Sequence, residues 1–142
     1  MTDGLVERAE LRVGYRIPPG LATRDLAEEV AAICARHDGG ANVTVEMVAS
    51  EEAARTSRTT PLARAFVASI GEVGARATFK VKSGTSDMNI LAPAWGCPMV
   101  AYGPGDSRYD HTPIERLALA DYERAISVLR GVLRRAGATA SK

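Results

Sequence analysis

The chain has 142 residues, of which 46% are hydrophobic and 25% charged, and its formal net charge is +1. This length suits one domain or slightly more, and the composition is that of an ordinary globular protein. No apolar run approaches the roughly 18 residues of a membrane span, and near-neutral charge argues against binding nucleic acid through its phosphates. The N-terminus lacks the pattern of a secretion signal, and Cys34 and Cys97 lie far apart. We therefore expect a cytoplasmic protein with reduced thiols.

The first part of the chain is predicted to fold as strand, helix and strand. Residues 9–17 alternate apolar and polar side chains, which is typical of a half-buried strand, and two prolines and a glycine at 18–20 end it. Thr23 is the predicted N-cap of a helix that ends near residues 38–40, and alternation resumes over residues 42–48. The apolar positions of this helix are Leu26, Val30, Ile33 and Cys34.

A polar segment over residues 50–60 has no apolar period and is the best candidate for a linker between two domains. Pro61 suits the first turn of a second amphipathic helix, which ends at Gly74. Its apolar positions are Leu62, Phe66, Ile70 and Val73.

After this helix the sequence predicts two short strands and a final helix. The strands cover residues 78–82 and 98–102, and polar loops follow both of them. The final helix covers about residues 121–136, with Tyr122, Ile126, Leu129 and Leu133 predicted to face inward. The fold class expected from this order of elements is α/β, with ligand-binding loops at the ends of strands.

His111 is the most informative candidate for chemistry. It lies in a short polar turn after a predicted strand, next to Asp110 and two residues before Pro113. A neutral imidazole there could ligate a metal, with a neighbouring carboxylate orienting its other nitrogen. Alternatively, it is a surface histidine with local hydrogen bonds. One histidine cannot hold a zinc ion by itself, because zinc sites need three or four protein ligands.

The loop Ser83-Gly84-Thr85-Ser86-Asp87 is a second candidate. A glycine flanked by hydroxyls lets backbone N–H groups approach an anion, and Lys80 and Lys82 add positive charge beside it. These features suit a carboxylate or acyl group. The alternative is a hydroxyl-rich turn in which Asp87 caps a short helix.

Two further residues have both a functional and a structural interpretation. Arg16, on the polar face of the first predicted strand, could clamp a carboxylate or be a solvated strand arginine. Cys97 has no acid–base partner near it in sequence, which favours a buried structural thiol.

Taken together and in order, several segments resemble the C-terminal part of the dinuclear zinc amidohydrolases. This family includes acetylornithine deacetylase, succinyl-diaminopimelate desuccinylase and the carboxypeptidase-like aminoacylases. The resemblance is strongest to its LysW-lysine and LysW-ornithine hydrolases, which release an amino acid from an amino-group carrier protein in lysine and arginine biosynthesis. The segments that carry the resemblance are AELRVGYRIPPG at 9–20, FKVKSGTSDMN at 79–89, APAWGCP at 92–98, AYGPGD at 101–106 and DHTP at 110–113.

The resemblance implies roles for individual residues. His111 matches a late histidine that ligates one zinc of the pair, and Gly103 and Gly105 match the turn that presents it. Arg16 matches a lid arginine that holds a substrate carboxylate. The residues matching a loop that lines the substrate pocket are Ser83, Gly84, Thr85 and Ser86. In the intact enzyme two zinc ions would polarise the amide carbonyl and supply hydroxide.

The departures from the family pattern are as informative as the matches. The chain has no His-x-Asp pair, and its Glu pairs at 28–29 and 51–52 do not follow an apolar strand. The catalytic base and most zinc ligands are therefore missing, and no residue is assigned as catalytic. We expect half of an α+β lid or dimerisation domain over residues 1–57 and the C-terminal section of a zinc-binding catalytic domain over residues 58–142.

This interpretation predicts an incomplete zinc site, and so an inactive isolated chain. Its expected partners are a missing N-terminal catalytic portion, an acidic carrier protein that meets Lys80 and Lys82, and a second copy in a homodimer. Neither nucleic acid nor a membrane is an expected partner. Two alternatives remain: a non-catalytic module that docks a carrier protein or sister subunit, and a deacetylase or desuccinylase of free acyl-amino acids.

Overall fold

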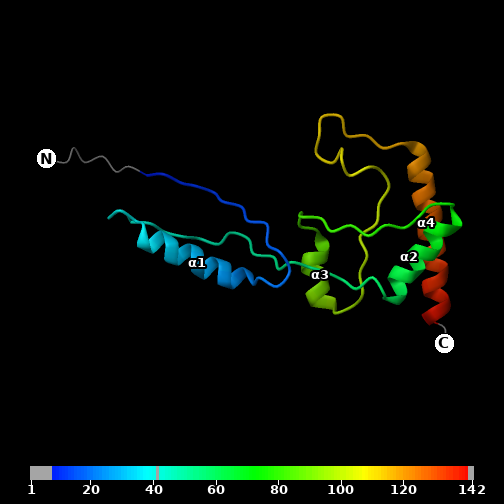
Figure 1. The fold of residues 1–142 in the computed structure, drawn as a ribbon, viewed down its shortest axis with the longest axis horizontal. Coiled ribbons are helices and arrows are strands. Elements are labelled where there is room, and N and C mark those ends of the chain that lie inside the picture. The colour runs from blue at the N-terminus through cyan, green and yellow to red at the C-terminus, as the bar shows by residue number, and fades with distance from the viewer. Residues whose placement is uncertain (1–7, 41, 141–142) are drawn as a thin grey trace.

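The computed structural model describes residues 8–40 and 42–140, and these form four helices. Residues 1–7 and 41 of the predicted 1–57 unit lie outside the described residues. The helices are α1 (Thr23–Arg36), α2 (Pro61–Glu72), α3 (Asp87–Trp95) and α4 (Leu119–Ala140). Helix α1 and its extended flanking segments reach away from the pair formed by α2 and α4, and α3 lies between them (Figure 1). No helix within the described ranges is long and apolar enough to cross a membrane.

The core lies where α2 and α4 pack against each other. Phe66 of α2 is 9% exposed and Val128 of α4 is 1% exposed, and the Phe66 ring lies 5.2 Å from that of Tyr102. Gly131 allows the two helix backbones to approach closely, because a Cβ there would lie 2.8 Å from Ser69 Oγ. Arg135 links α4 to α2 by donating hydrogen bonds to Ser69 Oγ (3.2 Å) and to the Glu72 carboxylate.

Helix α2 begins as predicted, whereas α1 begins differently. Thr60 accepts a hydrogen bond from Ala63 N at 3.1 Å, and Pro61 stands at the first helical position. Thr23, however, is not the N-cap of α1: that position belongs to Ala22, and Thr23 lies within the helix. The Glu52 carboxylate takes over the capping function, because Oε1 accepts hydrogen bonds from Thr23 N (2.9 Å) and Thr23 Oγ1 (2.6 Å).

The predicted α/β class is not confirmed, because no strand forms in the described ranges. The four segments expected as strands, at 9–17, 42–48, 78–82 and 98–102, have no regular secondary structure. In the first three segments most apolar side chains are open to solvent, with Leu11 85% and Val81 81% exposed, whereas Val100 and Tyr102 of the fourth pack against the core formed by α2 and α4. A strand exists only through the hydrogen bonds it makes to a neighbour, and these segments do not pair with one another.

The inward face predicted for the last helix is wrong. Tyr122, Ile126, Leu129 and Leu133 are 50%, 41%, 43% and 71% exposed, whereas Ala125, Val128 and Val132 are buried. The reason is that α4 has two adjacent apolar faces, and α2 covers only one of them. We call the uncovered face, made of Tyr122, Ile126, Leu129 and Leu133, the open stripe of α4.

Candidate functional site

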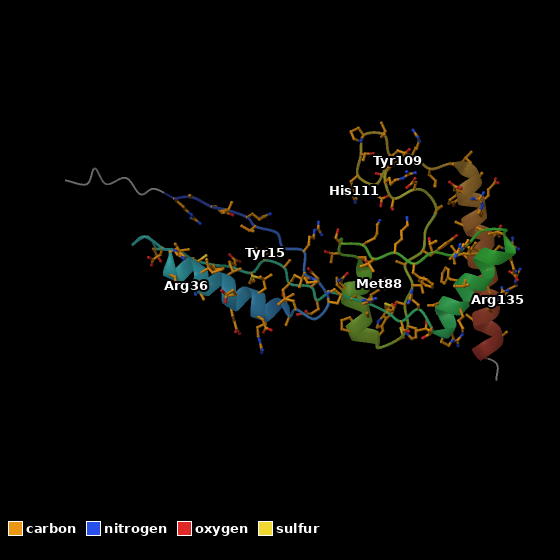
Figure 2. All side chains as sticks on the ribbon, viewed as in Figure 1. Tyr15, Arg36, Met88, Tyr109, His111 and Arg135 are labelled. Carbon is orange, nitrogen blue, oxygen red and sulfur yellow. The ribbon has the colours of Figure 1, made fainter. Side chains whose placement is uncertain are left out.

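His111 lies in a run of three successive turns between residues 106 and 115. Tyr109 N donates to Asp106 O (3.0 Å), Thr112 N to Tyr109 O (3.1 Å), and Glu115 N to Thr112 O (3.0 Å). Thr112 Oγ1 adds a second bond to Tyr109 O at 2.8 Å. His111 is exposed in the middle turn with a φ of 62°, and Figure 2 shows it with Tyr109 in the loop before α4.

An ion pair ties this turn to the segment before the predicted pocket loop. Lys82 Nζ lies 2.6 Å from Asp110 Oδ2. The loop at 83–86 follows Lys82 directly, so this contact brings its first residue near the turn that carries His111. Asp110 therefore pairs with a lysine, and the structure does not place it on an imidazole nitrogen as the sequence suggested.

The Asp106 carboxylate is held ionised by its neighbours. Arg108 Nε donates to Asp106 Oδ2 (2.8 Å), and Arg108 N donates to Oδ1 (3.0 Å). The side-chain hydrogen bonds, followed by the backbone hydrogen bond, lower the pKa of Asp106 from 3.8 to about 2, and the charges of Arg108 and Lys80 add smaller effects.

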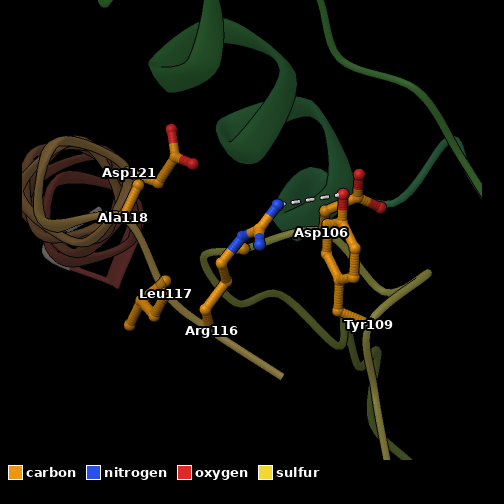
Figure 3. A pocket seen from close by; sticks show the side chains of 7 residues that line it. Asp106, Tyr109, Arg116, Leu117, Ala118 and Asp121 are labelled. Carbon is orange, nitrogen blue, oxygen red and sulfur yellow. Dashed lines mark hydrogen bonds between the residues drawn. The ribbon is translucent and has the colours of Figure 1, made fainter. Parts of the chain in front are cut away.

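Two shallow hollows flank the His111 turn. The first has a volume of about 190 Å³ and the second about 370 Å³; both are lined by Gly105, Asp106, Arg116 and Leu117. The Arg116 guanidinium lies 4.6 Å from the centre of the Tyr109 ring and donates to Tyr109 Oη at 3.3 Å (Figure 3). The second hollow is also lined by Asp110, the residue before His111, and by Glu115.

The predicted substrate-binding residues are only partly gathered at this place. Ser86 is the N-cap of α3, and Ser86 N donates to Asn89 Oδ1 at 2.9 Å, so this end of the loop starts a helix. Ser83, Gly84 and Thr85 are exposed. Arg16 is exposed in the extended segment before α1, and Figure 2 places its neighbour Tyr15 beside α1, apart from the His111 loop. Cys97 is exposed as well, so the prediction of a buried thiol is wrong.

The described residues do not assemble a metal site by themselves. No group of three or more His, Cys, Asp or Glu side chains comes together among them. Near His111, Asp110 is paired with Lys82, and Asp106 is paired with Arg108. A catalytic zinc requires about three protein ligands. The His111 imidazole could supply one such ligand, but the described residues do not complete the set, so no chemical step through a metal follows from the structure.

Sequence reasoning missed several residues that shape the site. Glu115 Oε2 accepts a hydrogen bond from His111 N at 3.0 Å. Arg108 and Arg116 hold the Asp106 carboxylate and the Tyr109 ring, respectively. The four-residue spacing from His111 to Glu115 was the available signal, but only the observed turns bring that carboxylate back to the amide.

Comparison with known proteins decides the family. The sequence profile of peptidase family M20/M25/M40 matches residues 2–135. The chain belongs to this family. The match includes α1 to α3, the His111 turn and most of α4, so the M20 region contains every candidate residue named above.

The M20 relatives include hydrolases of two kinds. The LysW-lysine hydrolase of Deinococcus radiodurans is 45% identical over 94% of this chain and 36% of its own length. A protein of Pyrococcus abyssi named as a LysW-lysine/LysW-ornithine hydrolase is 58% identical over 54% of the chain and 23% of its own length. A Mycobacterium tuberculosis protein named as a succinyl-diaminopimelate desuccinylase is 30% identical over 89% of the chain and 33% of its own length. The chain thus spans about a third or less of the length of these relatives.

Proposed function

We propose that this chain forms one part of an M20 amide hydrolase that releases lysine or ornithine from a carrier-linked form in amino-acid biosynthesis. The observation that carries the proposal is the 45% identity with a LysW-lysine hydrolase over 94% of the chain. In this proposal the isolated chain is inactive by itself, because a catalytic zinc needs about three protein ligands and His111 would supply one of them.

In this proposal the chain contributes to two domains. Residues 1–57 form half of an α+β lid domain, which also serves as the dimerisation surface, and residues 58–142 form the C-terminal section of the catalytic domain. The four extended segments become strands when strands from the rest of the hydrolase pair with them. The alternation of apolar and polar side chains over residues 9–17 and 42–48 and the mostly apolar run at 98–102 support this assignment, because such surfaces are stable only when covered.

The individual roles follow the same division. His111 contributes one ligand to a zinc pair whose other ligands come from outside the described residues. Arg16 binds a substrate carboxylate, and the loop at 83–86 lines the substrate pocket. Lys80 is exposed and faces an acidic carrier protein, whereas the ion pair with Asp110 leaves Lys82 less free to do so.

A chimeric enzyme tests this proposal. The stretch of the Deinococcus radiodurans hydrolase that matches this chain is replaced by the chain, and release of lysine from LysW-lysine is measured. We expect an active chimera, with activity abolished by His111→Ala and reduced by Arg16→Ala. A folded chimera without activity, or one that His111→Ala leaves unaffected, would contradict the proposal.

One observation favours a second candidate substrate class. The Mycobacterium tuberculosis relative named as a desuccinylase matches 89% of the chain, which supports an enzyme for free acyl-amino acids. The same chimera assayed with succinyl-diaminopimelate and acetylornithine separates the two classes. Faster hydrolysis of either free substrate than of LysW-lysine would favour the second candidate.

A non-catalytic module that docks a carrier protein or sister subunit is the remaining alternative, and the chain has the open surface that such docking would need. The chain exposes 11972 Å², against roughly 7,000 Å² for a compact chain of this size. Titration of the 142-residue chain with LysW in the presence of a chelator tests this alternative. Binding unaffected by the chelator, together with an inactive chimera, would support it.

A further inference from the structure

His111 has a backbone conformation that ordinary side chains avoid. Its φ of 62° is the only positive φ of a non-glycine residue among those described. It stands third in the turn that Thr112 N closes on Tyr109 O, a position at which a glycine is the usual choice. Nearby, Gly105 adopts a φ of 95° without a Cβ to oppose it. At His111 some interaction has to offset the steric cost.

Glu115 provides that interaction. Its Oε2 accepts a hydrogen bond from His111 N at 3.0 Å, and a charged acceptor makes this bond stronger than one between neutral groups. Glu115 is itself placed by its backbone N–H, which donates to Thr112 O at 3.0 Å. The Glu115 carboxylate can therefore reach the His111 amide only when the turn between residues 112 and 115 is formed.

We propose that Glu115 is a positioning residue for His111: its carboxylate holds the left-handed conformation and so fixes the direction in which the imidazole leaves the turn. The consequence for metal binding rests on the function proposed above. Groups that orient a ligand raise its effectiveness without touching the metal. Here the orienting contact acts through the backbone amide and leaves both imidazole nitrogens available.

The positioning is tested on the 142-residue chain by NMR, independently of any activity. The amide hydrogen exchange of His111 is measured together with the backbone couplings that report its φ, in Glu115→Ala and in Glu115→Gln. Glu123→Ala, which removes an exposed glutamate from α4, is the matched control, and circular dichroism confirms that the helices persist.

In Glu115→Ala we expect exchange at His111 to become about tenfold faster, as loss of one such hydrogen bond implies, with a change in the φ-dependent couplings. Glu115→Gln keeps an acceptor oxygen in reach and restores most of the protection, while Glu123→Ala leaves His111 unchanged. Unchanged exchange and couplings in Glu115→Ala, or an equal loss in Glu115→Gln, would overturn the proposal.

The chimera then separates this inference from the proposed function. If both hold, Glu115→Ala lowers kcat at least tenfold with little change in KM, and Glu115→Gln recovers most of the rate. If the NMR changes occur while kcat stays constant, Glu115 positions His111, and it is the proposed role of His111 in hydrolysis that fails.

Discussion

At the scale of single residues, the Asp106 carboxylate stabilises the turn before His111 by accepting hydrogen bonds from Arg108. Its pKa of about 2 lies below the ordinary 3.8, chiefly because of the Arg108 side chain. A carboxyl group with a lowered pKa stabilises the folded turn fully at pH values above its unfolded pKa. That contribution is lost as the pH falls through the folded pKa. The contribution of Asp106 to the turn before His111 should therefore be complete above a pH of about 4 and be lost as the pH falls towards 2.

Removal of the Arg108 side chain tests this assignment. In Arg108→Ala we expect the pKa of Asp106 to rise from about 2 most of the way towards 3.8, because the largest cause of the shift is gone. Carboxyl-carbon NMR titration measures it. Lys80→Ala, which removes the smallest of the contributions, serves as the control and should move the pKa much less. An unaltered titration of Asp106 in Arg108→Ala would refute the assignment.

Glu52 leads to a second prediction at this scale. The side-chain and backbone hydrogen bonds from Thr23 lower the pKa of Glu52 below 4.5. The ionised carboxylate therefore stabilises the start of α1 at neutral pH, and this stabilisation is lost as the pH falls through the lowered pKa. In Glu52→Ala we expect the first turn of α1 to lose protection from hydrogen exchange. Glu51→Ala removes the exposed neighbouring carboxylate and should have little effect. Equal protection in both variants would show that Glu52 does not hold the helix.

At the scale of elements, the contact between α2 and α4 depends on Gly131. A Cβ at this position would lie 2.8 Å from Ser69 Oγ and 3.0 Å from Ser69 Cβ. We expect Gly131→Ala to destabilise the chain by about 1–3 kcal/mol, the usual cost of overpacking. Gly71→Ala is the matched control, because a Cβ there meets nothing within 4 Å. It should be neutral or stabilising by up to about 1 kcal/mol.

Denaturant unfolding followed by circular dichroism measures both variants. A midpoint for Gly131→Ala equal to that of the parent chain would show that the helices can separate to admit a methyl group. The close approach of α2 and α4 would then not be a requirement of the core.

The elements also show what the sequence could and could not determine. The three long helices were predictable because their spacing and end signals are local, as Thr60 and Pro61 illustrate. The capping of α1 could not be predicted, because the carboxylate that accepts from Thr23 N belongs to Glu52, which lies 29 residues further along the chain. The buried face of α4 could not be predicted either, because α4 has two apolar faces and only the packing of α2 determines which of them is buried. At the site, the His111 turn was predictable from its polar residues, but the contact with Glu115 was not.

At the scale of the whole molecule, exposed area is the dominant feature. Roughly 7,000 Å² is expected for a compact chain of this size, and the observed 11972 Å² is about 1.7 times as much. We therefore expect the monomer in solution to have a radius of gyration clearly above the roughly 14 Å of a compact domain of this length. Small-angle X-ray scattering over a dilution series measures it. A radius of about 14 Å at high dilution would mean that the extended segments fold back onto the helices.

The open stripe of α4 has a consequence for how substitutions are tolerated. When the stability of the chain alone is measured, polar replacements of Ile126 or Leu133 should have as little effect as at other exposed positions. A polar replacement of the buried Val128 should destabilise the chain. Scored by lysine release from the chimera, the same replacements should become harmful wherever the rest of the hydrolase covers the stripe. Positions that change from tolerant to intolerant between the two screens would map, residue by residue, the surface that α4 presents to the remainder of the enzyme.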